Sequence, residues 1–410
     1  MSELNEGSSE IKPIRMKVIG VGGAGSNIVD RLMLSNPSDL HLTAINTDQQ
    51  ALSNSPVMDK HCIGKAVTHG LGAGGDADVG REAALADKQL LEEMVKDVDL
   101  LFLTAGLGGG TGTGVTPVLA DIAAQKGATV IVFVTLPFTI ERAARSNAAK
   151  VGLDKLREVA NAVIPLPNDL LIQESEPDAS LLEAFSQADA WVEKAIKSIW
   201  SMMNKTGLIN LDFSQLQQVF ANRSSKTLFG LGDGAGEDAT NAAIADLKLC
   251  PLLHTPEFSK KADQLLVNLI GGTSLGISET QRIMDSIADA FGKDANVVMG
   301  AVIDESMGDR VEICVIGTSG SSDVTIFRGR RRMKKIPSAN LVEPESAEIP
   351  EKKSRKSKKT HDKSEKTEQH EFSFSEGEPR GEFENTEGTM FEGQDLDTPT
   401  FLRRGVRIPI

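Results

Sequence analysis

Short apolar runs recur along residues 13–190, and stretches with helical spacing separate them. The runs are nearly continuous in apolar residues, which is typical of parallel strands covered on both faces. They predict strands at 16–21, 42–47, 100–105, 129–135 and 162–167. The stretches between and after them predict helices at 26–34, 78–96, 114–126 and 142–160. Strand followed by helix, repeated in this way, predicts a doubly wound α/β domain.

A second pattern follows this domain. Residues 178–203 carry apolar positions at helical spacing without Gly or Pro, and they predict a long helix that connects two domains. The sequence beyond predicts helices at 212–223 and 278–291, and strands at 264–270, 296–303 and 309–317. Long helices among a few strands indicate a smaller α+β domain.

The composition changes near residue 335, where Lys, Glu, Ser and Pro replace Val, Ile and Leu. Such a segment cannot bury enough apolar surface to offset its ordering entropy, so we expect a disordered linker over 321–394. The end of the chain, 395–410, regains Phe401 and Leu402 beside basic residues. This island is typical of a docking peptide, although an unstructured end with chance apolar residues fits the pattern equally well.

Charge and composition exclude several classes of protein. The 410 residues include 44 Lys and Arg against 58 Asp and Glu, a net charge of −14, which disfavours nucleic acid as a partner. No apolar run approaches the roughly 18 residues of a membrane span, and because the first residues are polar and acidic we do not expect a signal peptide there. Cys62, Cys250 and Cys314 are scattered without metal-ligand spacing, so we expect no metal scaffold and a reducing, cytoplasmic location.

Glycines cluster after the predicted strands. The first cluster, residues 20–27, matches G-x-G-x-x-G through Gly20, Gly22 and Gly25, and Asp48 follows the next strand. Glycine lets the backbone approach a phosphate closely, and a helix N-terminus supplies free N–H groups. Taken alone, this cluster is also compatible with a nicotinamide-dependent oxidoreductase.

A second glycine cluster, residues 106–114, follows the strand at 100–105 and adds the hydroxyls of Thr111 and Thr113. Two such loops suit a di- or triphosphate, which has several charged oxygens to satisfy. A third stretch, 70–80, either closes over a terminal phosphate or is an ordinary flexible loop. The chain has no G-x-x-x-x-G-K-[ST] motif, so it is not a P-loop protein.

These motifs, taken in order, carry a resemblance to a known family. They are GVGGAGSN (20–27), NTD (46–48), GLGAGGDADVG (70–80), GGGTGTG (108–114), LPFTIE (136–141), IPLPND (164–169), GLINLDF (207–213) and DTPTFLRR (397–404). Together they resemble the tubulin/FtsZ family of GTPases, and most closely its bacterial cell-division members. The likeness extends from about residue 14 to about residue 318 and returns at the tail.

The resemblance implies a domain plan and binding residues for GTP or GDP with Mg²⁺. The implied parts are a disordered tail (1–12), a GTP-binding domain (13–177), a central connecting helix (178–203), a C-terminal GTPase-activating domain (204–320), the linker (321–394) and the docking peptide (395–410). The residues implied to hold phosphate are Gly22, Gly23, Ala24, Gly25, Ser26, Asn27, Gly108, Gly109, Gly110, Thr111, Gly112 and Thr113. Those implied elsewhere are Asn46 and Asp48 at the nucleotide edge, Ala73, Gly74, Gly75 and Asp76 near the γ-phosphate, Glu141 and Arg145 at the ribose and phosphate side, and Asn168 and Asp189 at guanine.

In the family, catalysis is divided between subunits. The resemblance implies that Asn210, Asp212 and Gln215 enter the neighbouring subunit's pocket, so that assembly and hydrolysis are coupled. It further implies head-to-tail filaments that form the division ring at midcell and are tethered to the membrane by adaptors that bind 397–404.

The chain departs from the family at several positions. Gln215 stands where the family has a second Asp, and an amide can orient water but is no base, so we expect slower hydrolysis. A structural filament that binds GTP with little turnover is therefore the alternative. Arg142 occupies a position that is usually Gly, and Ala24 and Ser26 replace glycines of the first loop.

Overall fold

The computed structural model describes residues 14–35, 40–171, 180–204, 207, 209, 211–221, 225–254, 262–292, 294–319, 390–391 and 394–395. The chain divides into two units, Met1–Gly329 and Arg330–Ile410. In the second unit the described residues form two short antiparallel strands, β11 (Met390–Phe391) and β12 (Gln394–Asp395). The predicted tail 1–12 lies outside the described residues, as do nearly all of the predicted linker and docking peptide.

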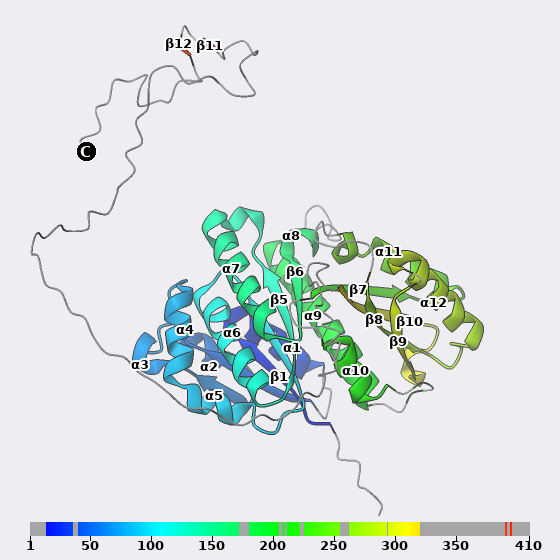
Figure 1. Cartoon of the computed structure of the whole chain (residues 1–410), viewed down its shortest axis with the longest axis horizontal. Helices are drawn as coiled ribbons and strands as arrows, with labels where there is room; N and C mark the ends of the chain where they lie inside the picture. The colour runs from blue at the N-terminus through cyan, green and yellow to red at the C-terminus, as the bar shows by residue number, and fades with distance from the viewer. Residues whose placement is uncertain are drawn as a thin grey trace, which may run out of the picture. The chain divides into compact units, whose positions relative to one another are not determined.

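A six-stranded parallel sheet forms the first half of the large unit (Figure 1). Its order is β3-β2-β1-β4-β5-β6, which confirms the doubly wound α/β prediction. The strands are β1 (Met16–Val21), β2 (His41–Asn46), β3 (Asp59–Cys62), β4 (Leu100–Gly106), β5 (Thr129–Leu136) and β6 (Ala162–Pro167). Because β3 is a polar edge strand with the sequence DKHC, it has no apolar run from which to predict it.

Helices cover both faces of this sheet. One face packs against α1 (Gly22–Leu34) and α9 (Leu181–Asn204), and the other against α4 (Ala77–Ala86), α5 (Lys88–Met94), α6 (Gly110–Gln125) and α7 (Ala143–Val159). The remaining elements of this half are α2 (Gln49–Ser53), α3 (Lys65–Thr68), η1 (Thr139–Glu141) and α8 (Asn168–Leu171). The single helix predicted at 78–96 is wrong, because Asp87 separates α4 from α5 and its Oδ2 accepts the Gly64 N–H at 2.6 Å.

The helices predicted at 26–34 and 114–126 begin earlier than expected, because the glycine segments are helical themselves. A Cβ on Gly25 would overlap the carbonyl of Thr104, and a Cβ on Gly112 would overlap that of Gly106. Glycine therefore lets the first turns of α1 and α6 lie directly against the end of β4.

The second half of the large unit is built on a four-stranded mixed sheet in the order β7-β10-β8-β9. Its strands are β7 (Lys226–Gly234), β8 (Gln264–Gly271), β9 (Asn296–Ile303) and β10 (Val311–Ser319), and only the pair β8–β9 is parallel among these described strands. Its helical elements are α10 (Phe213–Val219), α11 (Ala239–Leu249), η3 (Pro251–His254), α12 (Ile277–Phe291) and η4 (Glu305–Met307). The prediction of 212–223 as one helix was too long, because α10 ends at Val219.

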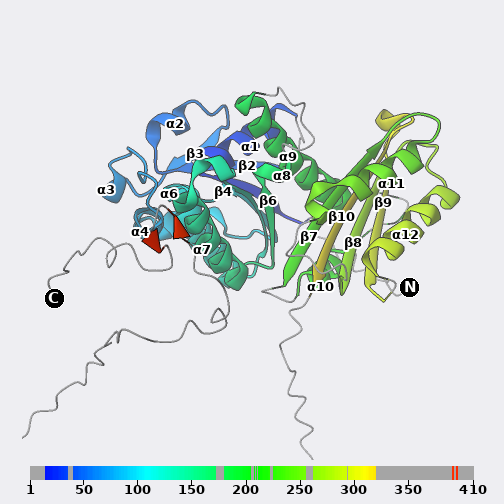
Figure 2. The same ribbon diagram turned by 90° about the horizontal axis from the view of Figure 1, so that it is seen from above.

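Helix α9 lies between the two sheets, as Figures 1 and 2 both show. Its residues Val192 and Ile196 belong to the same buried cluster as Phe133 of β5 and Phe229 of β7. The rings of Phe133 and Phe229 meet edge-on with their centres 6.1 Å apart. The two halves of this unit are therefore joined by a shared apolar core.

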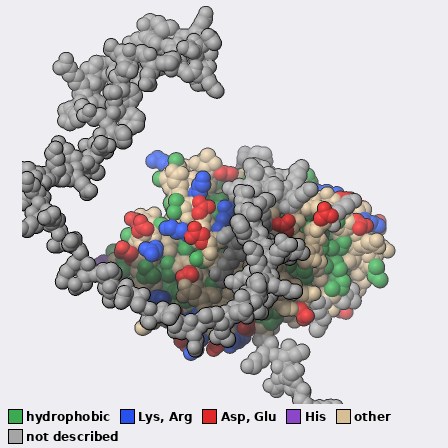
Figure 3. All heavy atoms as spheres, in the orientation of Figure 1, with side chains coloured by type: hydrophobic (Ala, Val, Ile, Leu, Met, Phe, Trp, Pro, Cys, Tyr) green, Lys and Arg blue, Asp and Glu red, His purple; other side chains and the backbone are tan. Residues whose placement is uncertain are grey.

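The visible surface of the described residues carries acidic and basic side chains interspersed over both halves (Figure 3). Within the described part of the chain, no helix combines the length and the apolar character that crossing a membrane requires.

Candidate nucleotide-binding site

A cavity of about 310 Å³ opens at the carboxyl ends of β1, β4, β5 and β6. This edge of a doubly wound sheet, where the strand order reverses, is the usual place for a ligand. The predicted residues that line it are Gly22, Gly23, Ala24, Gly109, Gly110, Thr111, Gly112, Glu141, Arg145 and Asn168. Four segments that are far apart in the sequence therefore meet at one cavity.

Two helices begin at this cavity, α1 at Gly22 and α6 at Gly110. Neither has a side chain that caps its first N–H groups, and neither has an acidic residue in its first turn. Free N–H groups and the positive end of the helix dipole favour a bound anion. The convergence of two such ends suits a ligand with more than one phosphate.

The segment of Ala73 to Asp76 lies beside the start of α6. A Cβ built on Gly110 would come within 2.7 Å of the Ala73 Cβ and 2.8 Å of the Asp76 carbonyl oxygen, so the two backbones are in close contact. Asp76 caps α4 through its Oδ1, and Asp48 caps α2 in the same way. Neither carboxylate lines the cavity itself, and each is held by the N–H groups of the helix that it caps.

Several predicted residues do not line the cavity. Gly25, Ser26 and Asn27 lie further along α1, where Ser26 is buried and its hydroxyl has no hydrogen-bond partner among the described residues. Thr113 is buried and its Oγ1 accepts the Gly108 N–H at 2.8 Å, which stabilises the loop itself. Asn46 is also buried, and its Oδ1 accepts the Asp48 N–H at 3.2 Å.

The opposite end of the cavity presents groups suited to a base. Asn168, at the start of α8, is 3% exposed, and its Oδ1 has no hydrogen-bond partner among the described residues. A buried amide oxygen left unpaired costs about 1–3 kcal/mol, which a donor on a ligand would recover. An N–H group of a purine is such a donor.

Phe185 also lines the cavity, and the sequence did not single it out. It is 40% exposed, and its ring meets that of Phe138 edge-on with centres 5.0 Å apart. A partly exposed ring at the base end offers a stacking surface. The signal that could have found it is a single aromatic residue in the first turns of α9, whose other residues are aliphatic or polar.

Asp189 lies one helical turn after Phe185, on the same face of α9. It is partly buried and does not line the cavity. Burial raises the pKa of Asp189 to about 7, and the positive charge of Arg31 partly opposes this rise. The carboxyl group therefore titrates near neutral pH.

Glu141 and Arg145 form an ion pair at the third side of the cavity. The Glu141 Oε1 also accepts the Phe138 N–H at 2.9 Å, which holds the carboxylate within η1. Between them, Arg142 has φ +78° and ψ 157°, a conformation that glycine adopts readily and other residues rarely. The backbone thus keeps a glycine-like turn at the position where the family usually has Gly.

The predicted catalytic residues lie elsewhere. Asp212 and Gln215 stand at the start of α10, and both are exposed, while Asn210 lies outside the described residues. Later in α10, the Gln217 Nε2 donates to the Thr129 Oγ1 at 3.2 Å. Thr129 is the first residue of β5, so α10 packs at the amino end of the sheet.

The cavity lies at the carboxyl end of the same strand. The eight residues of β5 span about 26 Å at ~3.3 Å per residue. Figures 1 and 2 agree in placing α10 far from α8, which carries Asn168. The structure therefore does not bring Asp212 and Gln215 to the cavity of their own chain.

The start of α10 is stabilised by Gln215 itself. The Gln215 Oε1 accepts the Asp212 N–H at 3.1 Å, which satisfies one of the free donors at the helix terminus. In this state the amide carbonyl of Gln215 is engaged with the backbone.

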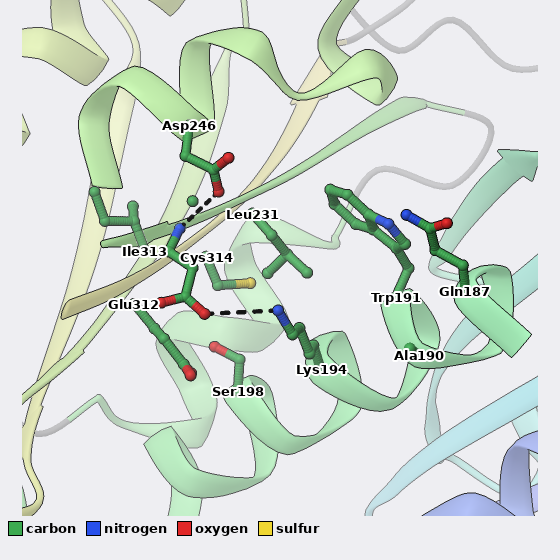
Figure 4. Close-up of a pocket in the computed structure, with 12 residues that line it drawn as sticks. Gln187, Ala190, Trp191, Lys194, Ser198, Leu231, Asp246, Glu312, Ile313 and Cys314 are labelled. Atoms are coloured by element: carbon green, nitrogen blue, oxygen red, sulfur yellow. Dashed lines mark hydrogen bonds and ion pairs between the residues drawn. The ribbon is translucent and has the colours of Figure 1, made fainter. Parts of the chain in front are cut away.

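A second cavity, of about 210 Å³, lies between α9 and the strands β7 and β10 (Figure 4). Lys194 pairs there with Asp233 at 3.7 Å, and the Asp246 carboxylate accepts the Asp233 N–H at 2.8 Å. Among the predicted site residues that the structure describes, none lines this cavity. We interpret it as part of the junction between α9 and the second sheet.

The fold and the first cavity define a class: an α/β nucleotide-binding protein whose phosphate site is built from two helix N-termini rather than a P-loop. Residues 15–176 match the model of the Tubulin/FtsZ family GTPase domain, and residues 225–320 match that of the FtsZ family C-terminal domain. The chain belongs to the tubulin/FtsZ family, as the sequence motifs predicted.

Solved structures agree with this assignment. An empty FtsZ dimer from M. jannaschii is 32% identical, with a TM-score of 0.71 over 76% of this chain and 90% of that one. A tryptophan-to-tyrosine mutant of the M. jannaschii FtsZ is 33% identical, with a TM-score of 0.70 over 75% and 91%. A GTPγS-bound protofilament of CetZ2 from Haloferax volcanii is 23% identical, with a TM-score of 0.63 over 75% and 95%, and shares the fold.

Proposed function

We propose that this chain hydrolyses GTP in filaments and that a neighbouring copy completes each active site. The observation that carries the proposal is the separation of Asp212 and Gln215 from the cavity by the length of β5. Residues placed so far apart act on one nucleotide when the α10 end of one copy meets the cavity end of the next.

The surface at the cavity end supports such a contact. Leu71, Ile140 and Leu182 are 82%, 74% and 79% exposed, and each lies in or next to a segment that adjoins the cavity. Apolar side chains gathered around a polar site are typical of a protein interface. A contact between two different ends of the molecule does not close on itself, so it produces a filament.

The nucleotide is bound along the cavity in this proposal. The first turns of α1 and α6 hold the phosphates, with Ala73 to Asp76 beside the γ-phosphate, and Glu141 and Arg145 flank the ribose. Asn168 and the ionised Asp189 accept the N–H groups of guanine, and these acceptors select guanine over adenine.

The residues at the phosphate end also fit Mg²⁺. Asp48 and Asp76 each use one carboxylate oxygen to cap a helix, and the other oxygen has no hydrogen-bond partner among the described residues. Mg²⁺ is usually held by one or two carboxylates together with the phosphates, and when bound it neutralises phosphate charge.

Hydrolysis in this proposal uses the incoming α10 of the neighbouring copy. Its Asp212 carboxylate orients and polarises the attacking water, Asn210 acts beside it, and the Gln215 amide helps to orient the water without accepting its proton. We expect turnover to be slow for that reason. A filament with little hydrolysis is the second candidate, and the engagement of the Gln215 carbonyl in the helix cap favours it.

In the cell, we propose that the filaments form the division ring at midcell on the cytoplasmic side of the membrane. Residues 397–404 would bind membrane-tethering adaptors, and the linker would keep the filament close to them. As a flexible coil, the 74 residues of 321–394 would have a root-mean-square span of about 47 Å.

The experiment is GTP hydrolysis as a function of protein concentration, with sedimentation of the same samples. We expect turnover to begin with polymer at a critical concentration. Polymer with negligible turnover would favour the static filament. Turnover that is linear from the lowest concentration would contradict a shared site, and purified protein that carries NADH instead of guanine nucleotide would contradict the GTPase assignment.

A further inference from the structure

Thr47 joins three segments at the phosphate end of the cavity. It follows β2, and its side chain is 0% exposed. The Thr47 Oγ1 lies 2.6 Å from the Thr111 Oγ1 in the first turn of α6. The Thr47 carbonyl accepts the Gly72 N–H at 3.1 Å and the Thr68 hydroxyl at 3.2 Å.

The direction of the bond between the two hydroxyls follows from counting donors. A hydroxyl has one hydrogen, and a buried hydrogen without an acceptor is unfavourable. Among the described residues, the Thr111 Oγ1 is the partner of the Thr47 hydroxyl. Thr47 therefore donates and Thr111 accepts.

This direction determines what Thr111 can offer. Thr111 lines the cavity and is only partly buried. Because its oxygen already accepts from Thr47, its own hydrogen remains free to point into the cavity as a donor. The opposite direction would turn lone pairs toward the phosphates, which is repulsive.

We propose that Thr47, which contacts no ligand itself, is a positioning residue that orients the Thr111 hydroxyl as a donor to a nucleotide phosphate. The inference rests on the proposed binding of guanine nucleotide in this cavity. A donor that is already oriented and polarised by a second hydroxyl forms a stronger bond to an anion than a freely rotating one.

The test compares ligands with and without phosphate. GDP and guanosine are titrated, guanosine by competition against a fluorescent GDP, at protein concentrations below assembly. Thr47→Val keeps the shape of the side chain and removes its hydroxyl, whereas Thr47→Ser keeps the hydroxyl. We expect Thr47→Val to weaken GDP binding by about 5- to 10-fold, the value of roughly one hydrogen bond, and to leave guanosine unchanged.

Two further comparisons separate positioning from a general structural effect. Thr47→Ser should bind GDP within about 2-fold of the original chain, and Thr47→Ala, which adds no methyl beside Thr111, should show the same selective loss as Thr47→Val. In a Thr111→Val background, Thr47→Val should cause no additional loss, because the hydroxyl that it orients is gone.

Equal losses for GDP and guanosine, or losses that add in the double variant, would overturn the role of Thr47. If the original chain binds GDP tightly and Thr47→Val binds it equally well, the role of Thr47 is overturned while the proposed function stands. An original chain that binds GDP no more tightly than guanosine would overturn the proposed function as well.

Discussion

Arg142 has a backbone conformation at which a side chain is strained, and it follows Glu141 directly. Replacing it by glycine should relieve that strain, which is typically about 1–3 kcal/mol, against a smaller entropic cost in the unfolded chain. We expect Arg142→Gly to raise the free energy of unfolding by about 1 kcal/mol.

Thermal unfolding of the nucleotide-free protein measures this change. Arg142→Ala is the matched control, because it removes the side chain but keeps the Cβ that causes the strain, and it should give no comparable gain. If Arg142→Gly were no more stable than Arg142→Ala, the backbone at this position would not be strained by a side chain.

Asp189 should make the stability of the nucleotide-free protein depend on pH. Its raised pKa means that, between about pH 4 and pH 7, the folded protein keeps a proton that the unfolded chain has lost. Stability from this group therefore falls as pH rises through that window. Asp189→Asn should remove this fall, and it should also weaken GDP binding because the amide no longer presents two acceptors to guanine.

Melting temperatures between about pH 5 and pH 8 give the measurement. The variant should gain stability over the original chain toward the upper end of this range and little at the lower end. Asp285→Asn, on the exposed face of α12, is the control and should follow the original profile. If the melting temperatures of Asp189→Asn and of the original chain changed with pH in the same way, the raised pKa of Asp189 would be contradicted.

At the scale of elements, the first turn of α10 carries Gln215 in place of the family's Asp, and we expect this difference to slow hydrolysis. Gln215→Asp should raise turnover per polymerised subunit by roughly 10-fold, because a carboxylate can accept a proton from water and an amide cannot. An acidic residue in the first turn also suits the helix dipole, so α10 should stay intact. Gln215→Ala is the control and should lower turnover, and turnover that is unchanged or lower in Gln215→Asp would contradict the role of Gln215.

The sequence predicted the elements with long apolar runs and missed those without them. The strands β4 and β5 are almost entirely apolar and buried, and their predicted bounds were close. The strand β7 ends in GLGDG, which resembles a loop, and it was not predicted. The starts of α1 and α6 were placed late because glycine is a poor helix former, whereas here close packing against β4 favours it.

At the scale of the whole molecule, most of the residues that the family motifs predicted to hold phosphate line one cavity in the structure. It did not reveal Phe185 or the link between Thr47 and Thr111, because both depend on contacts between segments that are distant in the sequence. Nor could spacing alone show that α10 packs at the amino end of the sheet. That placement follows from the second domain docking against α9 and the start of β5.

The central claim is that the site is shared between copies, and mixing two variants tests it most directly. Asp212→Ala has an intact cavity and a defective α10, and Asp189→Asn has a weakened cavity and an intact α10. At limiting GTP, each alone should hydrolyse slowly, and an equimolar mixture should exceed the sum of the two. A mixture equal to that sum, or full turnover by Asp212→Ala alone, would contradict a site completed by the neighbouring copy.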